Sequence, residues 1–317
     1  MRALITGAGG FVGGYLSTYL LEHTDWELLG TVYPELKEDP KSSPRLRLAY
    51  ADLRDLRQVA DLVESFDPGV IFHLAAQSSP PSSFADPWDT LENNIHCQLN
   101  VLEGVRRSGR PTRVLVIGSS EEYGYPRQEE LPLTEESPLR PVNPYAISKM
   151  TQDFLGLQYY LAHGVETVRL RPFNHTGPGR PPRFVVPAFA SQIARVEAGL
   201  QEPVVRVGNL DAARDFTDVR DMVRAYYLAA TRAEPGEVYN LASGRAHSVR
   251  GLLETLLSLS TAEIRVEVDP DRYRPVDAPV IYGSAEKFRR CTGWQPEIPF
   301  EQTLRDTLEY WRNQGGE

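Results

Sequence analysis

A tyrosine and a lysine four positions apart, Tyr145 and Lys149, are the residues of this sequence best suited to proton transfer. They follow Asn143-Pro144 in a long helical pattern, and residues at i and i+4 share one face of a helix. An ammonium group beside a phenol stabilises the phenolate, so we predict that Lys149 lowers the pKa of Tyr145 from its ordinary value of about 10. Such a tyrosine can donate or accept a proton near neutral pH.

The chain contains the same spacing a second time, at Tyr33 and Lys37, so the spacing alone is weak evidence. Pro34 disfavours helical backbone at the tyrosine before it. Pro144 instead stands where a first helical residue belongs, with Asn143 as its N-cap. Context therefore favours the later copy.

A serine cluster precedes this helix and follows the apolar run 114–117, which is typical of a buried strand. The cluster reads Gly-Ser-Ser-Glu-Glu-Tyr-Gly over 118–124 and begins its polar part at Ser119 and Ser120. The sequence thus predicts hydroxyl groups at the end of a strand, close to the tyrosine and lysine of the following helix.

Glycines at positions 7, 10 and 13 lie between a strand-like run at 2–6 and a helical pattern at 15–22. This order is typical of a dinucleotide-binding turn, in which the missing side chains let the backbone approach a pyrophosphate at a helix N-terminus. We therefore expect Gly7, Gly10, Phe11, Val12 and Gly13 to contact the cofactor.

The end of the next strand, 27–32, normally separates NAD from NADP, through an acidic side chain or an arginine respectively. Tyr33 stands there, and it indicates neither NAD nor NADP. A third strand at 46–50 leads to Asp52 and Leu53, where the aspartate can accept a hydrogen bond from adenine or cap the following helix. Further cofactor contacts are expected at Leu74, Ala75, Ala76 and Asn94.

Strands and helices alternate up to residue 174, which predicts an α/β fold with a Rossmann-like, doubly wound parallel sheet. We assign 1–174 to this dinucleotide-binding domain and expect 208–241 to return to it. The segments 175–207 and 242–317 are predicted to form a smaller α/β domain that binds a nucleotide sugar.

The net charge of −9 argues against nonspecific nucleic-acid binding. No apolar run approaches the length of a membrane span, and no secretory signal precedes the first strand, so a cytoplasmic protein is expected. The two cysteines, Cys97 and Cys291, indicate neither a disulfide framework nor a metal site. Arginines at 180, 183, 214, 272 and 274 suggest an anionic ligand.

Taken together, these motifs resemble those of the extended short-chain dehydrogenase/reductase superfamily, and the resemblance covers the whole chain. They are Gly7-x-x-Gly10-x-x-Gly13, Asp52-Leu53, Leu74-Ala75-Ala76, the Ser119 cluster, Tyr145-x-x-x-Lys149 and Arg171-Pro-Phe-Asn174. Within the superfamily, the segments 118–124, 173–179 and 207–221 are similar to those of GDP-sugar enzymes, in particular the GDP-4-keto-6-deoxy-D-mannose reductases. The resemblance implies NAD(P)H-dependent reduction of the C4 ketone of GDP-4-keto-6-deoxy-D-mannose to GDP-6-deoxy-D-mannose.

The resemblance also implies a role for each catalytic residue. Ser119 would hydrogen-bond the C4 oxygen of the sugar, Tyr145 would donate the proton, and Lys149 would hold the nicotinamide ribose. The substrate-binding residues that it implies are Ser78, Ser119, Ser120, Asn174, Phe184, Val185, Asn209, Arg214, Arg274 and Asp277.

Several alternatives stay open. Glu121 lies where GDP-mannose 4,6-dehydratases carry catalytic acid–base residues, so it is a candidate base for a dehydratase. A UDP-sugar epimerase is a further alternative, against which the arginine-rich segments argue, and a non-catalytic dinucleotide sensor would not need Ser119, Tyr145 and Lys149 together. The resemblance finally suggests a homodimer built on the helices near 90–107 and 145–163.

Overall fold

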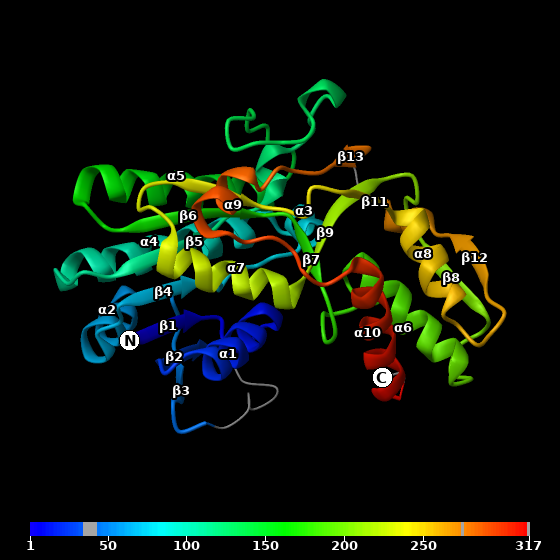
Figure 1. The fold of residues 1–317 in the computed structure, drawn as a ribbon, viewed down its shortest axis with the longest axis horizontal. Coiled ribbons are helices and arrows are strands. Elements are labelled where there is room, and N and C mark those ends of the chain that lie inside the picture. The colour runs from blue at the N-terminus through cyan, green and yellow to red at the C-terminus, as the bar shows by residue number, and fades with distance from the viewer. Residues whose placement is uncertain (34–42, 274–275, 316–317) are drawn as a thin grey trace.

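The structure is a computed structural model that describes residues 1–33, 43–273 and 276–315. Two predicted positions, Lys37 and Arg274, lie outside these ranges. Figure 1 shows a large part, built on one broad sheet, and a smaller part that contains α6, α8, α10 and the strands β8 and β12.

The large part contains a seven-stranded sheet in the order β10-β6-β5-β4-β1-β2-β3. All of its neighbouring strands pair in parallel. The strands are β1 (Arg2–Thr6), β2 (Glu27–Val32), β3 (Leu46–Tyr50), β4 (Val70–His73), β5 (Arg113–Ile117), β6 (Thr167–Pro172) and β10 (Val238–Leu241). The strand order reverses direction between β1 and β4, which confirms the predicted doubly wound arrangement.

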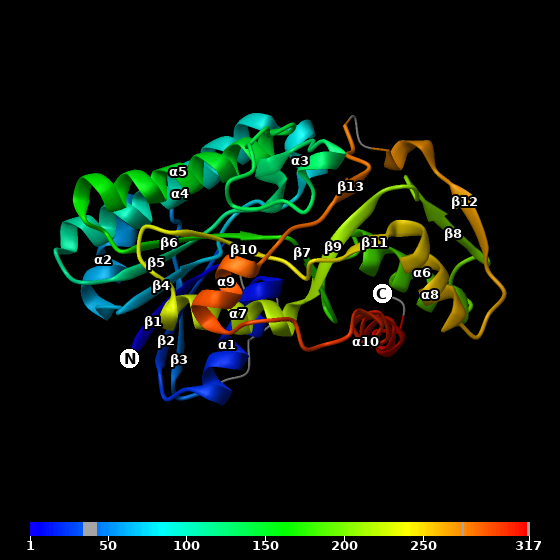
Figure 2. The same ribbon diagram turned by 45° about the horizontal axis from the view of Figure 1, so that its top comes forward.

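Helices cover both faces of this sheet, as Figure 2 shows. One layer contains α1 (Phe11–His23), α7 (Val219–Arg232) and α9 (Glu286–Thr292). The other contains α2 (Leu56–Phe66), α4 (Pro87–Ser108) and α5 (Pro144–His163). Each layer encloses a separate apolar core, because the strands alternate their buried side chains between the two faces.

The smaller part has its own core of buried aliphatic and aromatic side chains. Its helices are α6 (Val185–Glu197), α8 (Val249–Ser258) and α10 (Phe300–Asn313), and β8 (Val204–Val207) pairs in parallel with β12 (Arg265–Val268). A further sheet joins β7 (Asn174–Thr176), β9 (Ala213–Asp218), β11 (Ala246–Ser248) and β13 (Val280–Ile281). Short elements complete the fold: α3 (Pro80–Ala85) and the 3-10 turns η1 (Ser120–Tyr123), η2 (Gln128–Glu130) and η3 (Pro270–Arg272).

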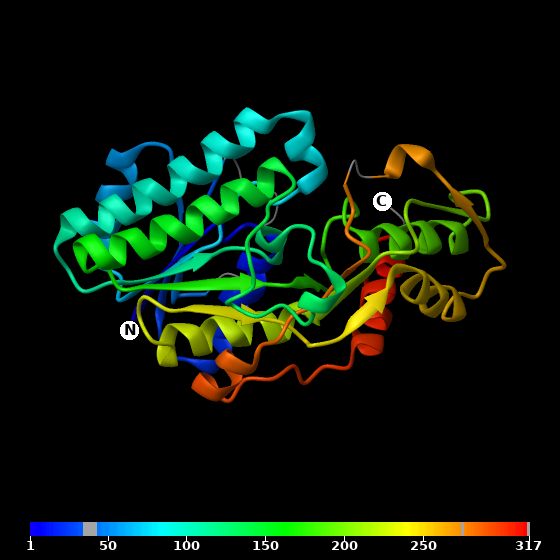
Figure 3. The ribbon, with the colours of Figure 1, turned by 90° about the horizontal axis from the view of Figure 1, so that it is seen from above.

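The C-terminal segment crosses between the two parts. Phe288 and Trp294 are buried in the core beneath α7 and β10, whereas α10 packs against α6 in the smaller part. In Figure 3 the orange and red end of the chain runs along the large part before it reaches α10. The domain boundaries stay a prediction. The apolar side chains of 286–294, which the prediction assigns to the smaller domain, pack in the core beneath α1 and α7 of the large part. Among the helices in the described ranges, none has the length and apolar character needed to span a bilayer.

Candidate active site

Helix α5 places Tyr145 and Lys149 on one buried face, as the sequence predicts. The helix starts at Pro144, and the side chain of Asn143 accepts a hydrogen bond from the Ala146 N–H at 2.8 Å. The Lys149 ammonium donates to the carbonyl oxygen of Ile117 at 2.8 Å and lies 5.9 Å from the centre of the Tyr145 ring. The lysine thus reaches from α5 to the end of β5.

The predicted lowering of the Tyr145 pKa is wrong for this structure. Burial raises the pKa of Tyr145 above its ordinary value, and a hydrogen bond with Ser119 opposes this only in part. Burial also lowers the pKa of Lys149 to about 8. The physical reason is that both groups lie in the protein interior, where the charged form of each is poorly solvated. At neutral pH Tyr145 therefore holds its proton, which suits a proton donor.

The serine cluster forms the turn η1 at the end of β5, directly opposite the start of α5. Ser119 is 8% exposed, and its Oγ accepts a hydrogen bond from the Glu121 N–H at 3.2 Å. The Glu121 carboxylate accepts a hydrogen bond from the Asn143 side chain at 3.0 Å. A cavity of about 150 Å³ brings together the four predicted catalytic residues, and it is also lined by Ser78, Ser120, Asn174 and Phe184.

The glycine turn forms one wall of a neighbouring cavity of about 870 Å³. Gly7 has a φ of +70°, and a Cβ atom on Gly13 would lie 2.3 Å from the Gly7 carbonyl oxygen. Helix α1 begins at Phe11, four residues earlier than predicted, and its N-cap is Gly10, which has no side chain to cap the first N–H groups. Its first backbone N–H groups are therefore available to an anion, so these residues fit the pyrophosphate of a dinucleotide.

A third cavity, of about 540 Å³, continues from the glycine turn past the ends of β2 and β3. Its lining includes the predicted cofactor residues Tyr33, Asp52, Leu53, Leu74, Ala75 and Ala76. Asp52 forms an ion pair with Arg54 at 2.7 Å, and Arg54 also donates to the Tyr33 hydroxyl at 2.9 Å. The N-cap of α2 is Asp55, not Asp52. The place of Arg54 in this cavity was not predicted, because an arginine for the cofactor was expected at the end of β2, and Arg54 follows β3.

Asn94 is completely buried and connects two elements of the site. Its amide accepts from the Gln77 N–H at 2.8 Å and donates to the Ser148 Oγ at 2.9 Å. This side chain therefore fixes the loop after β4 against the helix that carries Tyr145. These bonds give Asn94 a structural role. Its contact with the cofactor stays a prediction.

The predicted residues for the nucleotide lie around a cavity of about 440 Å³ beside the small one. These residues are Asn174, Phe184, Val185, Asn209, Arg214 and Asp277. Asp277 forms an ion pair with Arg214 and accepts a hydrogen bond from Asn209 at 2.9 Å. Two guanidinium groups of the predicted anion site thus have carboxylate partners, since Arg272 pairs with Asp269 at 3.0 Å.

Arg180 joins the cofactor side of the site to the sugar side. It lines both the large cavity and the small one, and its guanidinium lies 3.8 Å from the centre of the Phe184 ring. It also lies 5.4 Å from the centre of the Phe11 ring in the glycine turn. The sequence placed Arg180 only in a group of arginines, because the packing of a loop against a distant turn has no local signal.

Comparison with known proteins places this architecture in a family. A sequence model described as GDP-mannose 4,6 dehydratase matches residues 4–307. The chain belongs to this family. The extended short-chain dehydrogenase/reductase resemblance is thereby confirmed.

Individual relatives of this family member cover nearly all of its length. A GDP-6-deoxy-D-mannose reductase of Pseudomonas aeruginosa is 36% identical over 313 residues, which span 98% of this chain and 97% of the relative. A GDP-mannose 4,6-dehydratase of Sinorhizobium fredii is 30% identical, again over 98% of this chain and 97% of the relative. The structure of RMD from Pseudomonas aeruginosa complexed with NADPH superposes with a TM-score of 0.87 at 35% identity and covers 99% of each chain.

Proposed function

We propose that this protein is an NAD(P)H-dependent reductase that converts GDP-4-keto-6-deoxy-D-mannose to GDP-6-deoxy-D-mannose, also called GDP-D-rhamnose. The observation that carries the proposal is the meeting of Ser119, Tyr145 and Lys149 at one cavity, next to a glycine turn suited to a dinucleotide. The 36% identity with a GDP-6-deoxy-D-mannose reductase supports the substrate.

Tyr145 and Ser119 are the residues proposed to act on the C4 oxygen of the sugar. Reduced nicotinamide, when bound, supplies the hydride for the C4 carbon of the sugar. Tyr145 donates a proton to the C4 oxygen, and its raised pKa keeps that proton in place at neutral pH. The Ser119 hydroxyl donates a hydrogen bond to the same oxygen and stabilises the negative charge that develops there.

The cofactor is proposed to lie along the carboxyl ends of the sheet strands. Gly7, Gly10 and Gly13 would admit its pyrophosphate, and Lys149 would hold the ribose of its nicotinamide half. The adenosine would lie between Tyr33, Asp52 and Leu53. The binding of NADPH by the Pseudomonas aeruginosa structure supports NADP, while this chain's β2 end carries neither determinant.

A substrate panel tests the proposal. The purified protein is mixed with GDP-4-keto-6-deoxy-D-mannose and either NADPH or NADH, and the absorbance of the reduced cofactor is followed. We expect one equivalent of cofactor to be oxidised per sugar, and much slower reaction with dTDP- and UDP-linked 4-keto sugars. If no sugar oxidises either cofactor, the proposed activity is wrong.

A GDP-mannose 4,6-dehydratase is the second candidate, and Glu121 is the observation that favours it. Its carboxylate lines the sugar cavity, where a base for a C5 proton would be needed. A dehydratase would consume GDP-mannose without added reductant, because it recycles its cofactor. Glu121→Gln should abolish that reaction, but should leave reduction of the 4-keto sugar within about tenfold, since reduction needs no base at C5.

We further propose a homodimer in the cytoplasm, formed through α4 and α5. Ile147, Phe154 and Leu161 of α5 are large apolar side chains that are 41%, 50% and 72% exposed. Such a patch on one helix favours an interface between protein chains. Light scattering should give twice the chain mass, and Leu161→Glu with Phe154→Glu should give the mass of one chain.

A further inference from the structure

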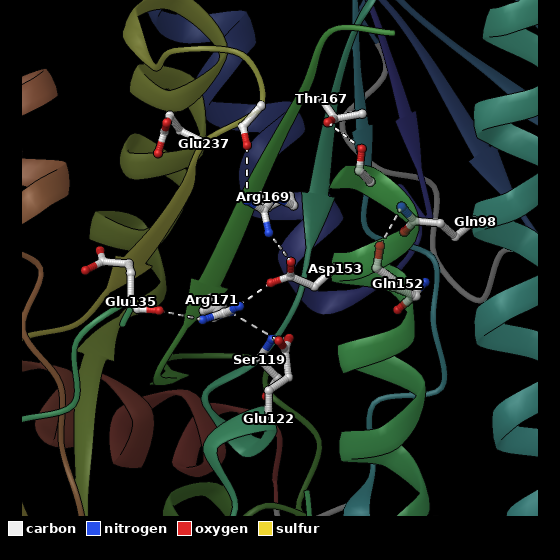
Figure 4. Close-up of polar contacts among 12 residues, drawn as sticks. Gln98, Ser119, Glu122, Glu135, Gln152, Asp153, Thr167, Arg169, Arg171 and Glu237 are labelled. Atoms are coloured by element: carbon white, nitrogen blue, oxygen red, sulfur yellow. Dashed lines mark hydrogen bonds and ion pairs between the residues drawn. The ribbon is translucent and has the colours of Figure 1, made fainter. Parts of the chain in front are cut away.

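Four buried charged residues lie directly behind the proposed catalytic serine. Glu122, Asp153 and Arg171 are each at most 4% exposed, and Arg169 is 7% exposed. Arg171 pairs with Asp153 at 2.8 Å and with Glu122 at 3.2 Å, and Arg169 pairs with Asp153 at 2.6 Å. Figure 4 shows this cluster between β6, α5 and the turn that follows β5. Two carboxylates thus face two guanidinium groups.

Glu122 is the member of the cluster that contacts the strand end. Its Oε1 accepts a hydrogen bond from the backbone N–H of Ser119 at 2.7 Å, and the Ser119 side chain caps the same turn in return. Gly118 leaves the space for this carboxylate, because a Cβ atom there would lie 2.3 Å from Oε1. The backbone of Ser119 is therefore fixed by a charged acceptor, which makes a stronger hydrogen bond than a neutral one.

Lys149 holds the same short segment from the side of α5. Its ammonium donates to the Ile117 carbonyl oxygen, two residues before Ser119. The peptide from Ile117 to Ser119 thus carries a cation at one end and the Glu122 carboxylate at the other. The two charges attract, and this attraction raises the pKa of Lys149 against the effect of burial.

The charges that face Glu122 come from each element packed around it. Arg171 of β6 stabilises its carboxylate, whereas Asp153 of α5 repels it. Lys149, also on α5, attracts it, and Tyr145 adds a phenol on the same helix. Burial and Asp153 raise the pKa of Glu122, whereas Arg171, the Ser119 N–H and Lys149 lower it. The carboxylate is the form that fits the contacts, because Oε1 faces the Ser119 N–H and Oε2 faces the Arg171 guanidinium, and both of these groups are donors. His73 of β4 faces Lys149 and stays neutral, because burial lowers its pKa to about 3.

We propose that Glu122 is a positioning residue of this active site, which fixes Ser119 and acts as the counter-charge that keeps Lys149 protonated. The role in placing Ser119 for catalysis rests on the proposed function. The effect of the Glu122 charge on Lys149 concerns the protein alone and can be measured without substrate or cofactor.

Two substitutions separate the halves of the proposal. Glu122→Gln keeps an oxygen acceptor for the Ser119 N–H but removes the charge. Glu122→Leu removes both. Asp153→Asn is the matched control, because it removes a buried carboxylate that pairs with the same arginine but does not contact Ser119.

The charge of Lys149 can be followed directly, because the chain has only four lysines: Lys37, Lys41, Lys149 and Lys287. The protein is labelled with 13C at the lysine ε-carbon and titrated by NMR, and the Lys149 signal is assigned with Lys149→Arg. We expect Glu122→Gln to lower the Lys149 titration midpoint by about half a pH unit or more. Asp153→Asn should not lower it. A midpoint unchanged by Glu122→Gln would overturn the counter-charge role.

Kinetics then test the positioning role. Glu122→Gln should move the alkaline limb of the kcat/KM profile to lower pH by the same shift, while Glu122→Leu should in addition lower kcat by about tenfold or more through misplaced Ser119. If Glu122→Leu folds, as judged by its thermal unfolding, and keeps the wild-type kcat, the positioning role is wrong. A wild-type protein without reductase activity would contradict the proposed function but would leave the NMR result intact.

Discussion

The ammonium of Lys149 donates a hydrogen bond to the carbonyl oxygen of Ile117 at 2.8 Å, across the boundary between α5 and β5. This bond joins the helix that carries Tyr145 to the strand end that carries Ser119. The relative position of the proposed proton donor and the proposed oxyanion donor is thus fixed inside the large part of the protein. Movement of the smaller part need not disturb it.

Tyr145→Phe should lower kcat for the 4-keto sugar by about 10²–10⁴-fold, because it removes the group that protonates the C4 oxygen. The affinity for NADPH, measured by the quenching of protein fluorescence, should change little. Tyr159→Phe is a suitable control, since this tyrosine lies on the same helix and its hydroxyl donates to Glu103 of α4 at 2.7 Å. Near wild-type turnover of Tyr145→Phe would remove this residue from the mechanism.

The pH dependence should have an alkaline limit set by Lys149. Burial lowers the pKa of Lys149 to about 8, so the ammonium is present at neutral pH and is lost as the pH rises through that value. Tyr145 keeps its proton over the same range, because burial raises its pKa. We therefore expect kcat/KM to fall on the alkaline side, as measured from initial rates in buffers of constant ionic strength. A profile that stays level well above the Lys149 midpoint would contradict this assignment.

Two adjacent glycines allow a matched test of the cofactor site. Gly13→Ala would place a methyl group 2.3 Å from the Gly7 carbonyl oxygen, so it should weaken NADPH binding and cost about 1–3 kcal/mol of stability. Gly14 is helical, and a Cβ atom there would meet no atom within 4 Å. Gly14→Ala should therefore keep cofactor affinity and stabilise the fold by about 0.5–1 kcal/mol. Equal effects of both variants on thermal stability and on NADPH binding would argue against a cofactor site at the glycine turn.

Asp277 competes with any anion for the guanidinium of Arg214. If Arg214 binds the diphosphate of the substrate, Asp277→Asn should lower KM for the GDP sugar by about fivefold, the equivalent of ~1 kcal/mol. Asp211→Asn is the control, because Asp211 pairs with Arg250 on the exposed surface at 2.8 Å. A KM that rises in Asp277→Asn would instead assign the carboxylate itself to substrate binding.

The elements that position the site could be predicted because their signals are local. The glycine spacing, the Asn143-Pro144 helix start and the apolar strands each follow from a few neighbouring residues. The strands Arg2–Thr6, Glu27–Val32 and Leu46–Tyr50 lie at the residues where the sequence predicts them. The shared helix face of Tyr145 and Lys149 also follows from their spacing.

The features that were missed depend on contacts between distant residues. The raised pKa of Tyr145 comes from burial by several elements, and the Arg54 contact with Tyr33 joins two strand ends. The N-cap of α2 is a local exception: the helix begins at Leu56, so its N-cap is Asp55 and not Asp52. Short strands such as β7, β11 and β13 carry too few residues for a recognisable alternation.

The central claim is that reduction occurs at C4 with Tyr145 as the proton donor. The most direct measurement uses NADPH that carries deuterium at its transferable position and follows the product by NMR. We predict deuterium at C4 of the GDP-6-deoxyhexose with the wild-type protein, formation of this labelled product at least about a hundredfold slower with Tyr145→Phe, and no deuterium at C5 when the reaction runs in D₂O with ordinary NADPH. Solvent deuterium at C5, or a C4 that remains unlabelled while GDP-mannose is consumed, would contradict the account.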